Sequence, residues 1–137
     1  VMSLPSDRQD RGREEAQRFA ELMRLAGQEA MLRSRDLAVE IDEQQYQFLI
    51  SDQNDWSVLK DEILKPRNLP DDMRFDVQLD GSAMLPTSTS EEELPRVYLF
   101  STGEMTPFEV ILRIESAEFN YRISGGLAGK LSLSEQP

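Results

Sequence analysis

The sequence contains neither cysteine nor histidine. Without cysteine the chain has no disulfide, no thiolate nucleophile and no cysteine-based metal site. Without histidine it has no Ser-His-Asp triad, no histidine-based zinc site and no copy of the commonest general base near neutral pH. These absences exclude several large classes of hydrolases and metalloproteins.

Long hydrophobic runs are also missing, so no segment of the sequence spans a bilayer, and no signal peptide is visible. The chain nevertheless starts with a short apolar stretch, Val1–Leu4, ahead of an abrupt change to charged residues. Two interpretations remain open: an artificial or frayed terminus, or the trailing end of a hydrophobic segment that has been removed. The residues upstream of Val1 would decide between them.

The charge of the chain is strongly acidic and unevenly distributed. Its 137 residues suffice for one domain with a core, and the net charge is −11. Residues 1–35 are nearly balanced at +1, so the remainder carries −12. An acidic body repels phosphate groups, and we therefore expect no nucleic-acid partner and no binding of the domain to an anionic membrane surface.

Motifs for catalysis or cofactor binding are weak throughout. The run Gly125–Lys130 ("GGLAGK") fails as a phosphate-binding loop, because its glycines are one residue too close and Leu131 occupies the position of the magnesium-binding hydroxyl. No carboxylate pair stands out in an apolar setting. We expect no enzyme activity, no cofactor and no metal. A peripheral cation is the minor alternative, on a group of four aspartates: Asp71, Asp72, Asp76 and Asp80.

The first part of the chain predicts one amphipathic helix, from about Arg8 to Ser34. Apolar and small residues recur at steps of three and four and fill an arc of about 140° at ~100° per residue. The residues of this arc are Ala16, Phe19, Ala20, Met23, Ala26, Gly27, Ala30 and Met31. We expect this face to pack on the rest of the protein, with residues 1–35 as the helical part.

After Arg35 the apolar period changes from 3.6 to 2, which predicts antiparallel β structure over residues 36–137. The expected strands are residues 37–41 and 45–50, which form a hairpin, then 56–59, 73–79, 97–100, 107–115, 119–123 and 131–133. Residues 101–106 are expected to join two of these strands as a second hairpin, with Gly103 at a positive φ. Residues 81–95 are expected to form a long mobile loop. The predicted class is α+β, a long N-terminal helix packed on a two-sheet β head.

Several segments, taken in order, resemble the H-type minor pseudopilins (GspH) of the bacterial type II secretion system. The most specific is "VYLFSTGEMTPFEVIL" (97–112), supported by "RNLP" (67–70) and "YRISG" (121–125), and the similarity runs from about Glu14 to Leu133. The resemblance implies a pilin-like fold and a non-enzymatic subunit of the pseudopilus, acting in its tip complex or its initiation. Minor pilins of type IV pili and ligand-binding β domains are the alternatives.

The resemblance also implies features outside the given sequence. Members of the family are made with a leader that a prepilin peptidase removes, and a hydrophobic N-terminal helix holds them in the bacterial inner membrane, with the head in the periplasm. That helix later packs inside the pseudopilus beside major and minor pseudopilins. The stub Val1–Leu4 fits a sequence that starts just after such a segment.

Two leucines are the candidate interaction residues. Leu25 and Leu32 fall together on a helical wheel, on the side away from the small-residue stripe. If the stripe covers the β head, the two leucines point outward and form a docking ridge for a neighbouring pseudopilin helix. Single exposed leucines are common, so the competing interpretation is an ordinary surface.

Overall fold

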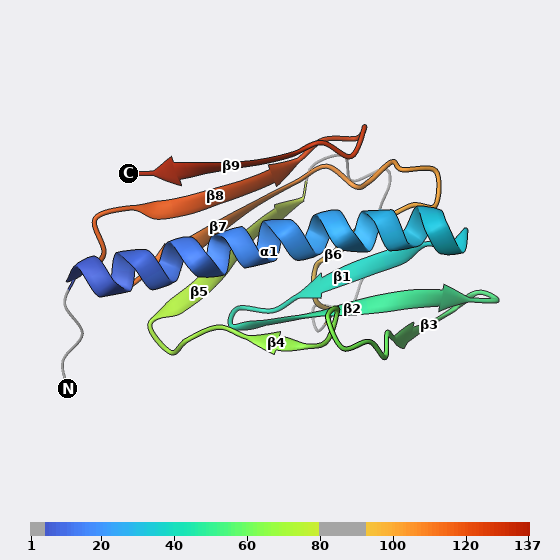
Figure 1. The fold of residues 1–137 in the computed structure, drawn as a ribbon, viewed down its shortest axis with the longest axis horizontal. Coiled ribbons are helices and arrows are strands. Elements are labelled where there is room, and N and C mark those ends of the chain that lie inside the picture. Colours follow the sequence, from blue (N-terminus) through green and yellow to red (C-terminus); the bar gives the residue numbers. More distant parts are fainter. Residues whose placement is uncertain (1–4, 80–92) are drawn as a thin grey trace.

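The computed structural model describes residues 5–79 and 93–137, which form one long helix and two antiparallel sheets (Figure 1). The α+β class and the two-sheet head predicted from the sequence are confirmed. Within these residues, no helix is both long and apolar enough to cross a membrane. The elements are α1 (Pro5–Arg33), β1 (Leu37–Ile41), β2 (Gln45–Asp52), β3 (Asp55–Val58), β4 (Arg67–Asn68), β5 (Met73–Leu79), β6 (Arg96–Leu99), β7 (Phe108–Ile114), β8 (Asn120–Gly125) and β9 (Leu131–Gln136).

The strands divide into two sheets that share one core. The first has the order β3-β2-β1-β6, with β4 also paired to β2, and the second has the order β5-β7-β8-β9. The predicted β1–β2 hairpin forms with Ile41 opposite Tyr46. The prolines on both sides of β4 keep it to two residues at the edge, because proline cannot donate to a sheet ladder.

Helix α1 runs along the whole molecule and lies across both sheets (Figure 1). Its buried face is turned by roughly 40° on the helical wheel from the predicted stripe, toward Leu22. Leu22 is therefore buried, whereas Met31, which we placed in the stripe, is 48% exposed. The helix packs on both sheets with one face, and the position of the second sheet is not encoded in the helix sequence.

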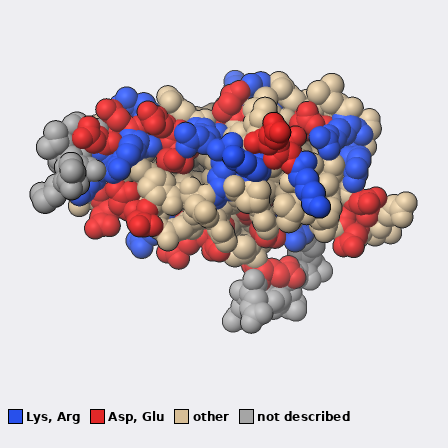
Figure 2. All heavy atoms as spheres, turned by 60° about the horizontal axis from the view of Figure 1, so that its bottom comes forward, with Lys and Arg blue, Asp and Glu red and all other residues tan. Residues whose placement is uncertain are grey.

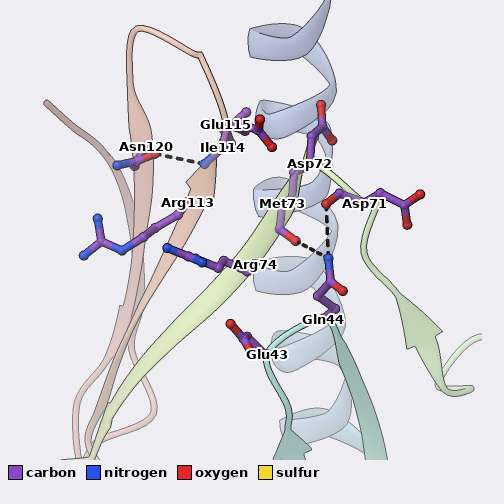
Figure 3. A pocket seen from close by; sticks show the side chains of 10 residues that line it. All are labelled: Glu43, Gln44, Asp71, Asp72, Met73, Arg74, Arg113, Ile114, Glu115 and Asn120. Carbon is purple, nitrogen blue, oxygen red and sulfur yellow. Dashed lines mark hydrogen bonds between the residues drawn. The ribbon is translucent and has the colours of Figure 1, made fainter.

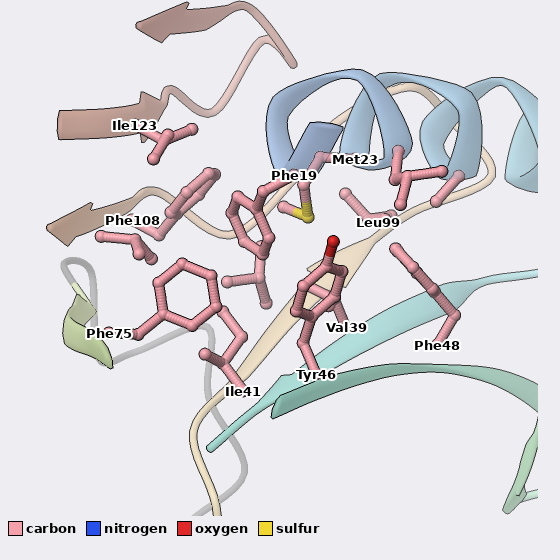
Figure 4. Packing of buried hydrophobic residues seen from close by; sticks show 14 of the residues in the cluster. Phe19, Met23, Val39, Ile41, Tyr46, Phe48, Phe75, Leu99, Phe108 and Ile123 are labelled. Carbon is pink, nitrogen blue, oxygen red and sulfur yellow. The ribbon is translucent and has the colours of Figure 1, made fainter. Parts of the chain in front are cut away.

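The main core lies between α1 and the inner faces of both sheets (Figure 4). Phe19 sits at its centre, with ring centroids 5.0 Å from both Tyr46 of the first sheet and Phe75 of the second. The predicted alternation is confirmed here, since Val39, Ile41, Phe48, Val110, Leu112 and Ile123 all point inward. Burying each large side chain contributes roughly 1.5–3 kcal/mol, which is what joins the two sheets.

The second predicted hairpin is wrong. β6 pairs with β1 in the first sheet, whereas β7 pairs with β5 and β8 in the second. Residues 101–106 do turn back, with Gly103 at a φ of 96°, and Thr106 N donates to Tyr98 O at 2.9 Å. Pro107 then has no N–H with which to continue the ladder, so the chain crosses to the other sheet. Thr106 is completely buried at this crossover, and its hydroxyl accepts a hydrogen bond from Tyr98 N.

The run 125–130 forms the turn between β8 and β9, as predicted, with Gly129 at a φ of 86°. A side chain at Gly129 would also meet the carbonyl oxygen of Gly103, so this turn packs on the crossover. The loop predicted at 81–95 lies mostly outside the described residues. Its last residues, 93–95, lead into β6, and Pro95 O accepts a hydrogen bond from Ile41 N at 3.0 Å.

Tyr46 carries a polar atom inside this apolar core, and we expect removal of its hydroxyl to stabilise the protein. Its side chain is 2% exposed, and no described residue forms a hydrogen bond with the hydroxyl. A buried hydroxyl without a partner costs about 1–3 kcal/mol. Tyr46→Phe should therefore raise the free energy of unfolding by about 1 kcal/mol or more, measured by urea denaturation. A fall in the free energy of unfolding by a similar amount would show that the hydroxyl has a hydrogen-bond partner in solution.

The same residue predicts a loss of stability at alkaline pH. Burial raises the pKa of Tyr46 from 10.0 to about 12, and the negative charge of Glu15 is the second cause of this shift. Between pH 10 and 12 the unfolded chain therefore releases this proton while the folded chain retains it, so stability falls as the pH rises. The expected loss is about 3 kcal/mol at most. Tyr46→Phe should remove this part of the pH dependence.

Candidate functional site

The two candidate leucines differ in their surroundings. Leu32, in the last turn of α1, is 80% exposed, as predicted. Leu25 is only partly exposed and packs against the main core, so the expectation that both point freely outward is wrong for Leu25. The cause is the rotation of α1 toward Leu22, which brings Leu25 to the border of the buried face. The two residues are also two turns apart, about 10 Å along the helix axis.

A shallow hollow of about 200 Å³ lies next to the β6–β7 crossover, on the side of α1 that carries Met23, Gly27 and Met31. Its walls are mainly apolar and come from Met23, Met31, Leu99, Met105 and Leu131, with Gly27 on the helix. A side chain at Gly27 would meet no atom within 4 Å. The exposed part of α1 near its end therefore combines Leu32, Met31 and an open position at Gly27.

The exposed charges of α1 are largely neutralised by each other. Four ion pairs join residues about one turn apart: Asp10 with Arg13, Glu15 with Arg18, Glu21 with Arg24, and Glu29 with Arg33. Hydrogen bonding and the charge of Arg24 lower the pKa of Glu21. Positive and negative side chains are interleaved over the face shown in Figure 2. The helix thus presents a mixed surface and not a basic patch of the kind that binds nucleic acid.

The start of α1 is attached to the head by contacts that the sequence analysis missed. Gln9 Oε1 accepts a hydrogen bond from Phe119 N at 3.0 Å, and Gln9 Nε2 donates to Phe119 O and to the Tyr121 hydroxyl. At Gly12 a Cβ would lie 2.1 Å from Ile114 Cδ1, so a larger residue requires a shift of Ile114 or of the helix. A glycine inside a helix, which costs about 1 kcal/mol, was the available signal.

A small aromatic cluster lies on the outer face of the first sheet, opposite α1. Trp56, Tyr98 and Phe100 pack there against Ala38 and Leu49, and the Trp56–Tyr98 ring centroids are 5.5 Å apart. Tyr98 is only 7% exposed, and Ala38 and Leu49 are buried. The rings contact each other and the sheet, as in a small core, so this cluster gives little support to an open platform for a carbohydrate.

A second hollow, of about 550 Å³, lies where the β1–β2 turn meets β5 and β7 (Figure 3). Its side chains are mostly charged or polar and hold backbone segments together. Gln44 Nε2 donates to Met73 O at 3.1 Å and to Asp71 O at 3.3 Å, and Asn120 Oδ1 accepts from Ile114 N at 3.0 Å. These contacts are structural and do not form a catalytic arrangement.

Metal-binding geometry is absent from the part of the chain that the structure describes, where no three acidic side chains are placed to hold an ion. Of the four aspartates considered for a cation, Asp72 pairs with Arg11 at 3.2 Å and Asp76 pairs with Arg113. Asp80 lies outside the described residues. Two of these four aspartates thus serve as partners of arginines.

Comparisons with known proteins agree with this geometry. The family model "Type II transport protein GspH" matches residues 15–129. Curated protein sequences give no match. Two structures of the minor pseudopilin EpsH from the type 2 secretion system of Vibrio cholerae are similar, with TM-scores of 0.73 and 0.72 and sequence identities of 26% and 23%. The alignments cover 93% and 90% of this chain and 96% of each EpsH chain.

The solution structure of GspH from E. coli is similar at a TM-score of 0.68 and 16% identity, covering 92% of this chain and 89% of that chain. Family model and fold agree over nearly all of the described residues. The chain therefore belongs to the GspH family of type II transport proteins, the H-type minor pseudopilins of the bacterial type II secretion system.

Proposed function

We propose that this minor pseudopilin acts by binding other pseudopilins at the tip of the pseudopilus, where it helps to initiate the filament, and that it has no catalytic activity. A helix lying across a β head is a rigid unit for assembly, and the other pseudopilins are the partners that the family implies. We further propose a leader removed by prepilin peptidase and a single-pass anchor in the bacterial inner membrane, with this domain in the periplasm.

One observation carries the proposed contact: Leu32 is 80% exposed at the end of α1. A large apolar side chain exposed to this extent gains about 1.5–3 kcal/mol when a partner covers it. Met31 beside it is 48% exposed, so the last turn of the helix offers more than one isolated side chain. We place the centre of the docking ridge at Leu32, with Leu25 as a partly buried support.

Leu32→Glu is expected to leave the chain folded and to weaken its binding to the purified heads of the other minor pseudopilins by about tenfold or more, since 1.4 kcal/mol corresponds to a factor of ten. Isothermal titration calorimetry measures the affinity, and secretion by the native bacterium carrying the full-length variant measures the function. Leu25→Glu should in addition lower the melting temperature, because Leu25 packs against the core.

Leu127→Glu is the matched control, because Leu127 is also exposed, at 47%, but lies in the β8–β9 turn. It should change neither stability nor affinity. Equal affinity of the Leu32→Glu and Leu127→Glu proteins for every pseudopilin head would reduce Leu32 to an ordinary surface residue.

The rival assignment, a type IV minor pilin that binds DNA, has less support. DNA binding requires a basic patch, whereas residues 36–137 carry a net charge of −12 and the arginines of α1 are mostly paired with acids. Retardation of DNA at moderate salt by the purified chain would favour the pilin assignment.

A further inference from the structure

The first turns of α1 hold to the head in a different way from the rest of the helix. Between residues 7 and 14 only Gly12 is buried, and glycine has no side chain to pack. From Ala16 onward the helix buries Phe19, Leu22 and Met23, followed by Ala26 and Ala30. The later part is thus fixed by apolar burial, whereas the start depends on a few polar contacts and on the close approach at Gly12.

Those polar contacts are made with the turn of residues 115–119, between β7 and β8, and with residues beside it. Gln9 uses both ends of its amide there, since Oε1 accepts from Phe119 N and Nε2 donates to Phe119 O at 3.2 Å and to the Tyr121 hydroxyl at 3.0 Å. A side chain that pairs both backbone groups of one residue fixes distance and orientation together. Arg11 adds an ion pair with Asp72, whose carbonyl accepts from Glu115 N at 2.9 Å.

The turn is also held by a contact that does not involve the helix. Asn120 Oδ1 accepts a hydrogen bond from Ile114 N at 3.0 Å, and Ser116 has a φ of 60°. A residue other than glycine in this region costs of order 1 kcal/mol and persists only where its surroundings require it. The turn is therefore fixed both by its own hydrogen bond and by its contacts with Gln9.

We propose that the turn 115–119 is a clasp that sets the angle between the start of α1 and the head, with Gln9 as its positioning residue. The clasp rests on the proposed function for its use: pseudopilins that associate through their helices must present helix and head in one fixed relation. Without it the helix start frays or swings while the apolar part stays docked, because the two parts are held by different interactions.

Gln9→Met tests the clasp, because methionine keeps the length of the side chain and removes its hydrogen bonds. The amide of Phe119 should exchange its hydrogen at least tenfold faster, since Gln9 Oε1 is its acceptor. Gln17→Ala is the control for helix composition, as Gln17 is exposed on the same helix. In Gln9→Glu the exchange rate of the Phe119 amide should lie between those of the parent and of Gln9→Met. Glutamate still accepts a hydrogen bond from Phe119 N but cannot donate one to Phe119 O.

The angle itself is measurable, because the chain has no cysteine and two introduced cysteines carry spin labels at known sites. Labels at Asp7→Cys and Arg74→Cys report the helix start, and labels at Gln28→Cys and Arg74→Cys report the packed part. In the Gln9→Met background the first distance distribution should broaden and the second should not change. The proposal would be overturned if the first pair gave the same distance distribution in the parent and in the Gln9→Met protein, or if the distributions of both pairs broadened.

In the full-length protein, Gln9→Met should lower secretion while Gln17→Ala does not, at equal protein levels. Normal secretion with a broadened helix start would refute the role in assembly. The spin-label result concerns the isolated chain alone, so its failure leaves the pseudopilin assignment intact. Conversely, if no pseudopilin head binds the parent chain, the proposed function fails. The spin-label distances still test the clasp in that case.

Discussion

Ala26→Arg is expected to unfold the protein or to lower its free energy of unfolding by at least about 4 kcal/mol. Ala26 is completely buried in the main core, on the face of α1 that contacts both sheets. An arginine there must either bury an unpaired charge or force the helix away from the sheets, and both belong to the most costly classes of substitution. Urea denaturation followed by circular dichroism measures the loss.

Gln28→Arg is the matched control for Ala26→Arg, because it introduces the same side chain two residues later, on the exposed side of the helix. Its free energy of unfolding should stay within about 0.5 kcal/mol of that of the parent. Similar midpoints for both variants would mean that α1 does not pack on the head through the face containing Ala26.

The second large effect is expected at Gly12, where leucine should destabilise the protein by about 2–4 kcal/mol. A Cβ at this position would lie 2.1 Å from Ile114 Cδ1 and 2.9 Å from Ile114 Cγ1, so either the Ile114 side chain must leave its packed position or the helix must move away from β7. Leucine is the better helix former by about 1 kcal/mol, so intrinsic propensity predicts the opposite sign.

Gly27→Leu separates these two effects within one helix. A Cβ at Gly27 meets nothing within 4 Å, so the gain in helix propensity should appear there as a higher melting temperature. Destabilisation at Gly12 together with stabilisation at Gly27 is the expected pair of results. A stabilised Gly12→Leu protein would show that the helix start does not approach β7 closely in solution.

Local sequence pattern was enough for most of the secondary structure. The period-2 alternation from Leu37 to Ile50 predicted the β1–β2 hairpin, because a shift by one residue would turn the inward-facing side chains of a strand away from the main core. The glycines of residues 125–130 likewise predicted the β8–β9 turn. At this level each residue is constrained mainly by its neighbours in the sequence.

The partner of each strand was less predictable. Strands flanking residues 101–106 looked like a hairpin because they are adjacent and joined by a turn with a glycine. The pairing was decided by β1 on one side and by β5 and β8 on the other, which lie far away in the sequence. Pro107 was a visible signal of the break, but it did not reveal where the strand went next.

The candidate site likewise has features that the local sequence predicted and features that depend on distant contacts. The sequence placed the proposed docking ridge on α1 and correctly predicted the exposure of Leu32, since a helical wheel requires only the local period. It could not predict the rotation that covers Leu25, because the width of the buried arc depends on where the second sheet lies. Gln9 was not predicted at all, because its partners follow 110 or more residues later.

On its own, the amino-acid sequence thus determined the α+β class, the helix and most of the strands. It also excluded histidine and cysteine chemistry, and several of its segments, in their order, showed the family resemblance. Tertiary packing alone decided how far α1 is rotated, which sheet receives β7, and where the start of the helix is held. The physical reason is that periodicity and turn preferences act over a few residues, whereas these three features depend on contacts such as Gln9–Phe119 and Gly12–Ile114 between distant parts of the chain.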